Sequence, residues 1–307
     1  MFFYSIQLKR KIYTLFFIGI ILSLVAFFSK EIYKPDYALR NVKAELVIPK
    51  ENTLLKRPQL VSQIEEKGKG LEENRIDVIA LVGEKGSGKT VLARYYGYAQ
   101  HDKIVWEFNA ENKETLSHSF KDFAYSLATT HIEKEELIKI ENIEDLETQA
   151  LSFLSFVKKI LKNHKNWLLI YDNIKNFSEI ENYLPQDTAL WGTGKVLLVT
   201  RDENLKDYKY LKPEDIIKVG ELQKEEALTL FSSILFDFSP NVLDLQEREA
   251  ALQFLNHIPH FPLDVTMAAR YIKNGKISYK KYLELLNQKD PGFQRLLKIF
   301  VDEGTDY

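Results

Sequence analysis

Residues 83–90, with the sequence GEKGSGKT, combine glycine, lysine and threonine at a spacing suited to binding phosphate groups. The pattern is a glycine, four free positions, a second glycine, a lysine and a serine or threonine. In such a loop, backbone N–H groups approach the phosphates closely, Lys89 reaches the β- and γ-phosphates, and Thr90 offers its hydroxyl to Mg²⁺. We therefore predict that a nucleoside triphosphate contacts Gly83, Glu84, Lys85, Gly86, Ser87, Gly88, Lys89, Thr90 and Val91.

The residues on either side of this loop predict the elements that position it. Residues 76–82 are nearly all apolar and rich in β-branched side chains, which indicates a strand buried on both faces of a parallel sheet. Residues 91–96 are typical of a helix, and a helix that starts at the loop directs the positive end of its dipole toward the phosphates. The alternative is a glycine-rich turn without a ligand, which the flanking strand and helix disfavour.

A second apolar run, residues 167–171, precedes Asp172. A carboxylate at the end of such a strand is expected to hold Mg²⁺, through water, opposite Thr90. Apolar strands that end in aspartate are common, so this assignment depends on the glycine loop before it. The next residue, Asn173, cannot accept a proton as a carboxylate does, so fast hydrolysis is not expected.

A third apolar run, residues 195–200, precedes Arg201. A guanidinium at this strand end would contact the γ-phosphate and so distinguish ATP from ADP. The alternative is a surface arginine that begins a loop. The sequence therefore predicts that Lys89, Asp172 and Arg201 act together on the phosphates.

Apolar runs and helical patterns alternate along the middle of the chain, which predicts an α/β fold, a P-loop NTPase with a central parallel five-stranded sheet. Residues 111–166 are expected to be mainly helical, with an acidic, solvated surface at 133–147. No strand pattern follows Leu222, so the rest of the chain predicts a small all-helical domain. The expected strands are residues 76–82, 103–109, 167–171, 195–200 and 216–219. The expected apolar helix stripes are Leu116, Phe120, Phe123 and Leu127, and Leu151, Leu154, Phe156, Val157, Ile160 and Leu161.

Residues 12–28 carry no charge, and basic residues occupy positions 9–11 before them. As a helix this segment spans about 25 Å, near the lower limit for crossing a bilayer. We interpret it as a single N-terminal transmembrane helix that anchors the chain. One alternative is a cleaved signal peptide, although Phe27 and Phe28 are too large for a good cleavage site, and another is a buried or interfacial helix.

Basic residues flank this segment on both sides, so the positive-inside rule does not orient it. Because ATP and Mg²⁺ are abundant in the cytosol, we predict a single-pass membrane protein whose nucleotide-binding domain is cytoplasmic. The predicted organisation is a basic segment at 1–11, the transmembrane helix at 12–28, a juxtamembrane connector at 29–59, a P-loop NTPase domain at 60–220 and a helical domain at 221–307.

The composition argues against several other kinds of site. The net charge of −2, with no basic tail, gives no reason to expect nucleic acid. The chain has no cysteine, which excludes disulfides and thiolate metal sites, and its 6 histidines lack the paired spacing of zinc ligands. His257 and His260 are close in sequence, and a loop or core role is predicted for them.

The order of these motifs resembles the NB-ARC nucleotide-binding domain of the STAND class of signalling ATPases, found in plant disease-resistance proteins, apoptosome scaffolds and bacterial proteins with repeat sensors. The resemblance covers about residues 49–282. No single segment beyond the glycine loop is specific, whereas six segments in the correct order are. After the loop these segments are residues 104–111, 169–173, 197–201, 219–222 with 225–227 and 230–231, and 260–263 with 268–272.

The resemblance also implies roles for residues outside the glycine loop. It places Pro262 of the helical domain against the adenine, and Arg57 where the family has an arginine that reads the nucleotide. The sequence departs from the family beside Arg57, because Lys56 replaces the usual glycine and Pro58 the acidic residue. The motif at 260–263 is also altered but keeps its proline. The residues that the resemblance assigns to the phosphates and Mg²⁺ are Lys89, Thr90, Asp172 and Arg201.

The chain stops about where the winged-helix domain of the family begins, so we expect a natural short form or a fragment, without that domain and without sensor repeats. The leading hypothesis is a membrane-anchored signalling switch that binds ADP or ATP with Mg²⁺, hydrolyses ATP slowly or not at all, and associates with protein partners or with itself. One alternative is an interaction module that uses ADP as a structural cofactor. Another is a motor or loader ATPase of the AAA+ type, for which the acidic residue after Asp172 is missing.

Overall fold

The computed structural model describes residues 46–49, 54–67, 75–100, 104–202, 205, 211–236 and 243–295. All of them belong to residues 40–307, one of the two compact units of the chain. The predicted membrane segment, residues 12–28, lies outside the described residues. Among the residues that are described, every helix is too short or too polar to cross a lipid bilayer.

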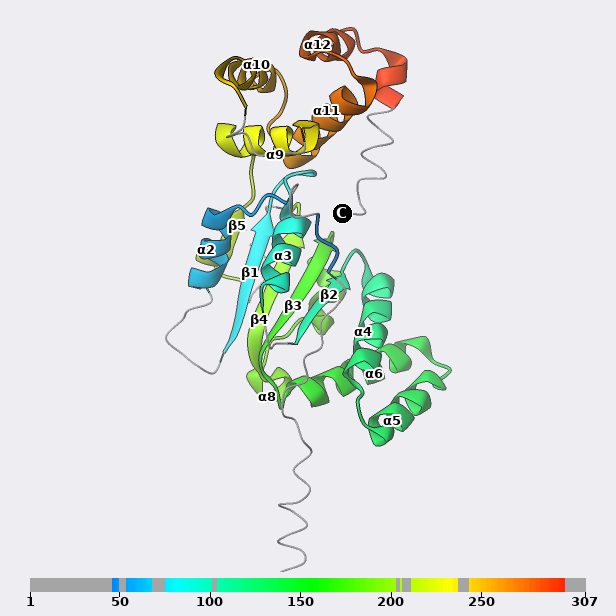
Figure 1. The fold of residues 1–307 in the computed structure, drawn as a ribbon. Helices are drawn as coiled ribbons and strands as arrows, with labels where there is room; N and C mark the ends of the chain where they lie inside the picture. Colours follow the sequence, from blue (N-terminus) through cyan, green and yellow to red (C-terminus); the bar gives the residue numbers. More distant parts are fainter. Residues whose placement is uncertain are drawn as a thin grey trace, which may run out of the picture. The chain divides into compact units, whose positions relative to one another are not determined.

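A five-stranded, fully parallel sheet lies at the centre of the fold, with the strand order β2, β3, β4, β1, β5 (Figure 1). Because parallel strands end at the same edge of a sheet, the residues that follow β1, β3 and β4 lie close together. The five predicted strands are confirmed, with ends that differ by a few residues. They are β1 (Ile76–Val82), β2 (Val105–Asn109), β3 (Lys165–Ile174), β4 (Thr193–Thr200) and β5 (Ile216–Lys218).

Helices cover both faces of the sheet, and the alternation of side chains along β1 decides which residues meet which helices. Ile79 and Leu81 pack in a core that includes α2 and α3, whereas Val78, Ala80 and Val82 pack in a core that includes α4 and α6. Burial of both faces explains why the strand is a continuous apolar run. The helices around the sheet are α2 (Pro58–Lys67), α3 (Lys89–Tyr98), α4 (Lys113–Leu127), α5 (His131–Glu141) and α6 (Leu146–Leu161). The shorter elements are α7 (Phe177–Ile180), η1 (Glu181–Tyr183), α8 (Thr188–Trp191) and η3 (Pro213–Asp215).

The helices α4 and α5 begin at local hydrogen-bond signals that the sequence encodes. The side chain of Asn112 accepts a bond from the N–H of Thr115, and Thr115 bonds back to the N–H of Asn112. Thr130 and Glu133 form the same reciprocal arrangement at the start of α5. Such capping satisfies N–H groups that have no partner within the helix. Only Leu137 of α5 is buried, in agreement with the solvated acidic surface predicted at 133–147.

The apolar stripe predicted along α4 is confirmed, because its four residues are fully buried. The stripe predicted along α6 is correct except for Leu151, which is 49% exposed. At about 100° per residue, Leu151 points roughly 140° away from the mean direction of the buried residues of α6, so it lies on the outer face of the helix. The prediction counted Leu151 as apolar without weighing its angular position.

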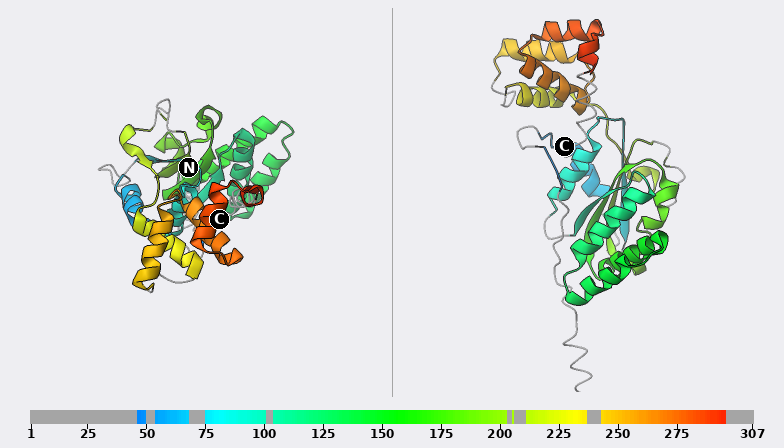
Figure 2. Two further views of the ribbon diagram at one scale, coloured as in Figure 1. Left: turned by 90° about the horizontal axis from the view of Figure 1, so that it is seen from above. Right: turned by 90° about the vertical axis from the view of Figure 1, so that its right-hand side faces the viewer.

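A third core is formed by the last helices of the described chain, which gather into a group of their own (Figure 2). Its centre is aromatic: Phe254 packs against Phe231 with ring centroids 5.3 Å apart and against Tyr279 at 5.0 Å. Tyr282 and Phe293 extend the cluster with an edge-to-face contact at 5.1 Å. The helices are α9 (Lys224–Phe236), α10 (Leu245–Leu255), α11 (Pro262–Gly275) and α12 (Tyr279–Asn287).

The two faces of α6 provide a matched test of this packing. We expect Leu154→Ala to lower the free energy of unfolding by about 2–5 kcal/mol, because Leu154 is 3% exposed and its loss leaves a cavity. The same substitution at Leu151 is expected to cost less than about 0.5 kcal/mol. Urea unfolding followed by circular dichroism measures both values. Equal losses in the two variants would contradict the assignment of Leu154 to the buried face of α6 and Leu151 to the outer face.

Candidate functional site

The glycine loop joins β1 to α3 with a backbone that only glycine adopts readily. Gly86 and Gly88 have φ angles of 82° and 87°, in the left-handed region. A Cβ atom on Gly86 would also lie 2.8 Å from the Cβ of Leu263. Gly88 is the N-cap of α3 and provides no side-chain cap. The first N–H groups of α3 therefore lack both an intrahelical acceptor and a cap, which leaves them available to an anion.

The side chain of Lys89 is buried beneath this loop. Its Nζ donates to the carbonyl oxygens of Gly83 and Glu84, both at 2.8 Å, and lies 3.5 Å from the Oγ of Ser87. Burial, followed by the positive charge of Arg201, lowers the pKa of Lys89 to about 8, an effect that Asp172 partly offsets. A phosphate would place a negative charge beside this ammonium group and stabilise its charged form.

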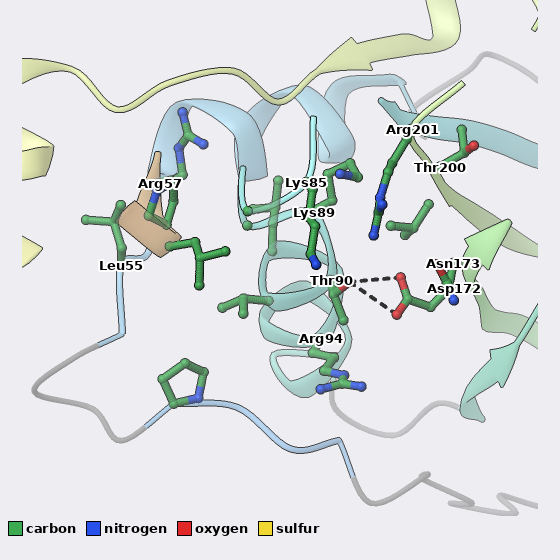
Figure 3. A pocket seen from close by; sticks show the side chains of 18 of the residues that line it. Leu55, Arg57, Lys85, Lys89, Thr90, Arg94, Asp172, Asn173, Thr200 and Arg201 are labelled. Atoms are coloured by element: carbon green, nitrogen blue, oxygen red, sulfur yellow. Dashed lines mark hydrogen bonds between the residues drawn. The ribbon is translucent and has the colours of Figure 1, made fainter. Parts of the chain in front are cut away.

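Thr90 and Asp172 face each other at the start of α3 and the end of β3. The Oγ1 of Thr90 donates to the two carboxylate oxygens of Asp172 at 2.9 and 3.2 Å (Figure 3). Burial raises the pKa of Asp172, the Glu107 carboxylate raises it further, and the Thr90 hydrogen bond opposes both effects. A divalent cation would stabilise the ionised form of this carboxylate.

The chemistry of this pair fits Mg²⁺. Hydroxyl and carboxylate oxygens are hard ligands, and protein sites for Mg²⁺ often supply one or two such groups and leave the remaining positions to phosphates and water. Within the described ranges, no group of three or more His, Cys, Asp and Glu side chains is placed to hold a metal by itself. Thr90 and Asp172 therefore suit a magnesium ion that arrives with a polyphosphate.

Arg201 follows β4, which lies next to β1 in the sheet, with Thr200 paired to Val82. This register brings Arg201 beside the glycine loop. Its charge acts on the pKa of Lys89, and its side chain is directed toward the space between Lys89 and Asp172 (Figure 3). The three residues predicted to act on the phosphates thus lie around the same space.

These residues line a cavity of about 940 Å³, near the upper end of the size range of small-molecule sites. The predicted site residues that line it are Arg57, Lys85, Gly86, Gly88, Lys89, Thr90, Val91, Asp172, Arg201 and Pro262. Gly83, Glu84 and Ser87 lie behind them, where their oxygen atoms face the ammonium group of Lys89.

The cavity also has lining residues that the sequence did not reveal. Thr266 and Arg270 line it from α11, four and eight residues after Pro262, so one face of this helix forms a wall. That spacing is visible in the sequence and could have predicted the first two. Arg94, Glu107, Pro49 and Leu55 line other parts. The sequence patterns assigned no role in the site to these four side chains, although Leu55 lies beside Arg57 and Glu107 lies in the matched segment 104–111.

Arg57 connects the glycine loop to the segment that leads into α9. Its Nη1 donates to the carbonyl oxygens of Ser87 at 3.4 Å and Gly220 at 3.2 Å, and its Nη2 donates to that of Glu221 at 3.1 Å. Its Nε lies 3.8 Å from a carboxylate oxygen of Glu226. Burial lowers the pKa of Arg57, which Glu226 partly offsets. Arg57 thus lines the cavity while its two Nη groups bind protein carbonyl groups.

Pro262 and Leu263 bring α11 against the loop. The N–H of Leu263 donates to the carbonyl oxygen of Gly86 at 3.2 Å. A Cβ atom on Gly88 would lie 3.4 Å from the Cγ of Pro262. The loop is therefore in direct contact with the helical part of the chain, and the two enclose the cavity together.

His257 and His260 have structural partners, as predicted. The Nδ1 of His257 lies 2.8 Å from the carbonyl oxygen of Gln253, and the Nε2 of His260 lies 3.0 Å from that of Leu255. Both contacts hold the turn between α10 and α11.

The strand order, the glycine loop and the paired Thr90 and Asp172 define a nucleotide-binding P-loop protein of the α/β class. The family model described as NB-ARC domain matches residues 59–240, which is more than half of the chain. The chain therefore belongs to the NB-ARC family, as the order of its motifs indicated.

Relatives with known descriptions are much longer than this chain. The chain is 22% identical over 251 residues to a nucleotide-binding leucine-rich repeat (NLR)-like protein of Hyaloscypha variabilis, covering 74% of this chain and 23% of that protein. It is 26% identical over 222 residues to the probable disease resistance protein At1g58390 of Arabidopsis thaliana, covering 66% and 22%. The chain spans about a quarter of the length of these relatives.

A search of solved structures matches the chain to Cdc6p from Pyrobaculum aerophilum, with a TM-score of 0.49 and 15% identity, covering 76% of this chain and 65% of that one. The Drosophila ORC bound to DNA matches with a TM-score of 0.46 and 14% identity, covering 76% and 66%.

The lowered pKa of Lys89 predicts that nucleotide binding takes up a proton. Without ligand the ammonium group loses its proton near pH 8, whereas a bound polyphosphate favours the charged form and raises this pKa. Affinity should therefore fall as the pH rises above 8. The expected proton uptake per bound Mg²⁺–ADP is therefore small near pH 7 and larger at pH 8.5.

Calorimetric titrations in buffers with different ionisation enthalpies measure this uptake. Below pH 7 the signal from Lys89 should vanish, which provides an internal control. Uptake that stays constant between pH 7 and pH 8.5 would contradict a Lys89 pKa near 8 in the free protein.

Proposed function

We propose that this NB-ARC protein is a signalling switch that binds ADP or ATP with Mg²⁺ and hydrolyses ATP slowly or not at all. The observation that carries the proposal is the composition of the cavity wall. Lys89, Thr90, Asp172 and Arg201 line one part of it, and Pro262 and other residues of the helical part line another. A nucleotide in this cavity contacts both parts, so its phosphates can favour one arrangement of them over another.

Slow hydrolysis is supported by the residue after Asp172. Asn173 lines the cavity and has a φ angle of 62°, a left-handed conformation that asparagine tolerates better than most residues. Its side-chain amide cannot accept a proton from an attacking water molecule. A bound ATP would then persist long enough to define a signalling state.

Arg201 is proposed to distinguish ATP from ADP. Its position beside Lys89 suits contact with a γ-phosphate, which ADP lacks. We expect Arg201→Ala to weaken ATP binding about tenfold, the effect of losing one charge-assisted hydrogen bond, and to leave ADP binding within about twofold of the parent. Equilibrium titration with each nucleotide measures the two affinities.

Two further variants serve as controls in the same assay. Lys89→Ala should abolish binding of both nucleotides, because the central cation of the loop is lost. Arg248→Ala removes an arginine of α10 that does not line the cavity, and both affinities should be retained. If Arg201→Ala weakens ADP and ATP equally, Arg201 does not read the γ-phosphate.

The second candidate function is an interaction module that keeps ADP as a structural cofactor. The arrangement of Arg57 favours this module, because the arginine joins the glycine loop to the helical part through protein carbonyl groups. A change in sedimentation on exchange of ADP for ATP would support the switch and its self-association. A motor of the AAA+ type would instead show fast multiple-turnover hydrolysis.

We further propose that residues 12–28 anchor the chain in a membrane, with the nucleotide-binding part in the cytoplasm. The uncharged sequence of this segment and the cytosolic supply of ATP and Mg²⁺ support the proposal. Protease added outside intact cells or spheroplasts should leave the nucleotide-binding part uncut, and lysis should expose it. Digestion before lysis would overturn the orientation, and recovery of the chain in the soluble fraction would overturn the anchor.

A further inference from the structure

The connector between the proposed anchor and α2 takes part in the nucleotide site. Two of its stretches are described, residues 46–49 and 54–57. Pro49 and Leu55 line the cavity, and Leu55 also packs against the core of the last helices. Both belong to the segment at 29–59 that was predicted as a connector, in which Arg57 alone was assigned to the nucleotide. The wall of the nucleotide cavity is thus completed by the connector.

The first stretch is attached to α3, the helix that follows the glycine loop. Leu46 packs against the core formed by α2, α3 and the sheet. The fit is close, because a Cβ atom on Gly97 would lie 2.9 Å from the Cδ1 of Leu46. The carbonyl oxygen of Val47 accepts a hydrogen bond of 3.3 Å from Nη1 of Arg94, whereas the side chain of Val47 is 54% exposed.

Arg94 joins this stretch to the part of the cavity lined by Thr90 and Asp172, here called the magnesium side. Its Nε and Nη2 donate to the two carboxylate oxygens of Glu107 at 2.8 and 2.7 Å, and the two side chains are each 17% exposed. Glu107 and Asp172 lie on neighbouring strands, where Asn109 pairs with Asp172. Charges on Glu107 and Arg94 both act on the pKa of Asp172, in opposite directions. A forked guanidinium holds such a pair in one geometry.

We propose that the connector is a coupling element of the nucleotide site: it docks on α3 through Leu46 and Val47, completes the cavity wall with Pro49 and Leu55, and is linked to the magnesium side by Arg94 as a positioning residue. Docking of the connector and binding of the Mg²⁺–nucleotide then stabilise each other. This inference rests on the proposed function of the same site. It adds the contacts through which a change of bound nucleotide would act on the proposed anchor at residues 12–28.

Coupling of this kind is reciprocal. If undocking of the connector speeds nucleotide release by some factor at an unchanged association rate, bound nucleotide must favour the docked connector by the same factor. The two effects are measured on different groups, one on the nucleotide and one on backbone amides of the connector. If Leu46 had only a structural role, its substitution would lower stability, and bound nucleotide would not favour the docked connector.

Leu46 and its neighbour provide a matched pair of variants for the test. Leu46 does not line the cavity, so Leu46→Ser leaves the residues that surround the nucleotide unchanged. Val47→Ser changes an exposed side chain and retains the carbonyl group that binds Arg94. With the full chain in detergent or bilayer discs, we expect Leu46→Ser to release fluorescent Mg²⁺–ADP about fivefold faster than the parent, and Val47→Ser to match the parent.

The role of Arg94 is tested by combining substitutions. Arg94→Gln removes both the fork to Glu107 and the bond to Val47. If Arg94 transmits the coupling, Leu46→Ser should add little to the release rate in an Arg94→Gln background. Two independent, multiplying effects would overturn this part of the proposal.

Hydrogen exchange of the parent chain gives the reciprocal measurement and requires no variant. Mg²⁺–ADP should slow exchange of the amides of residues 46–48 and 54–57, and omission of Mg²⁺ should reduce this protection. Should Leu46→Ser prove too unstable to study, Leu46→Ala with a thermal melt replaces it. Binding that is indifferent to Leu46 and to connector exchange would overturn the coupling alone. Absence of nucleotide binding by the parent would instead overturn the proposed function.

Discussion

The buried ammonium group of Lys89 is the charge around which the rest of the site is arranged. Removing a cation from water is costly unless partners replace the water, and the carbonyl groups of Gly83 and Glu84 provide them. In a tight loop, carbonyl groups that point inward leave N–H groups that point outward, toward a ligand. The same constraint explains the glycines, because this path requires φ angles that other residues adopt at a cost. A loop that holds its lysine in this way is already arranged for a polyphosphate.

The helical part of the chain has a core separate from the cores of the sheet. Leu263 bonds to the glycine loop, and Arg57 bonds to the loop and to the segment after β5. Gly220 in that segment has no atom within 4 Å of where a Cβ would lie. Parts of a chain with separate cores are expected to move relative to each other unless the interface between them is large and apolar. A ligand that contacts both parts would then stabilise their relative position.

Sequence patterns predicted those features that depend on local composition. The strands were evident because both faces of a parallel sheet are buried, and the phosphate loop was evident because its chemistry requires fixed residue types at fixed spacing. Leu151 was misplaced because an apolar residue was counted without its helical phase. The pair of Arg94 and Glu107 was missed because it depends on how α3 sits over β2. Short segments such as residues 46–49 have no periodicity, so nothing in the sequence marked them as part of the site.

The end of β3 shows how one irregularity bears on the lifetime of a bound nucleotide. The pairing of β3 with β4 shifts its register between Tyr171 and Ile174, and Asn173 within this stretch has a left-handed backbone. Glutamate at this position would have to adopt a conformation that asparagine tolerates and that costs most residues about 1–2 kcal/mol. The local backbone thus disfavours glutamate as a source of a general base beside Asp172. In the proposed switch a bound triphosphate must persist, and the amide of Asn173 after Asp172 offers no carboxylate that would shorten its lifetime.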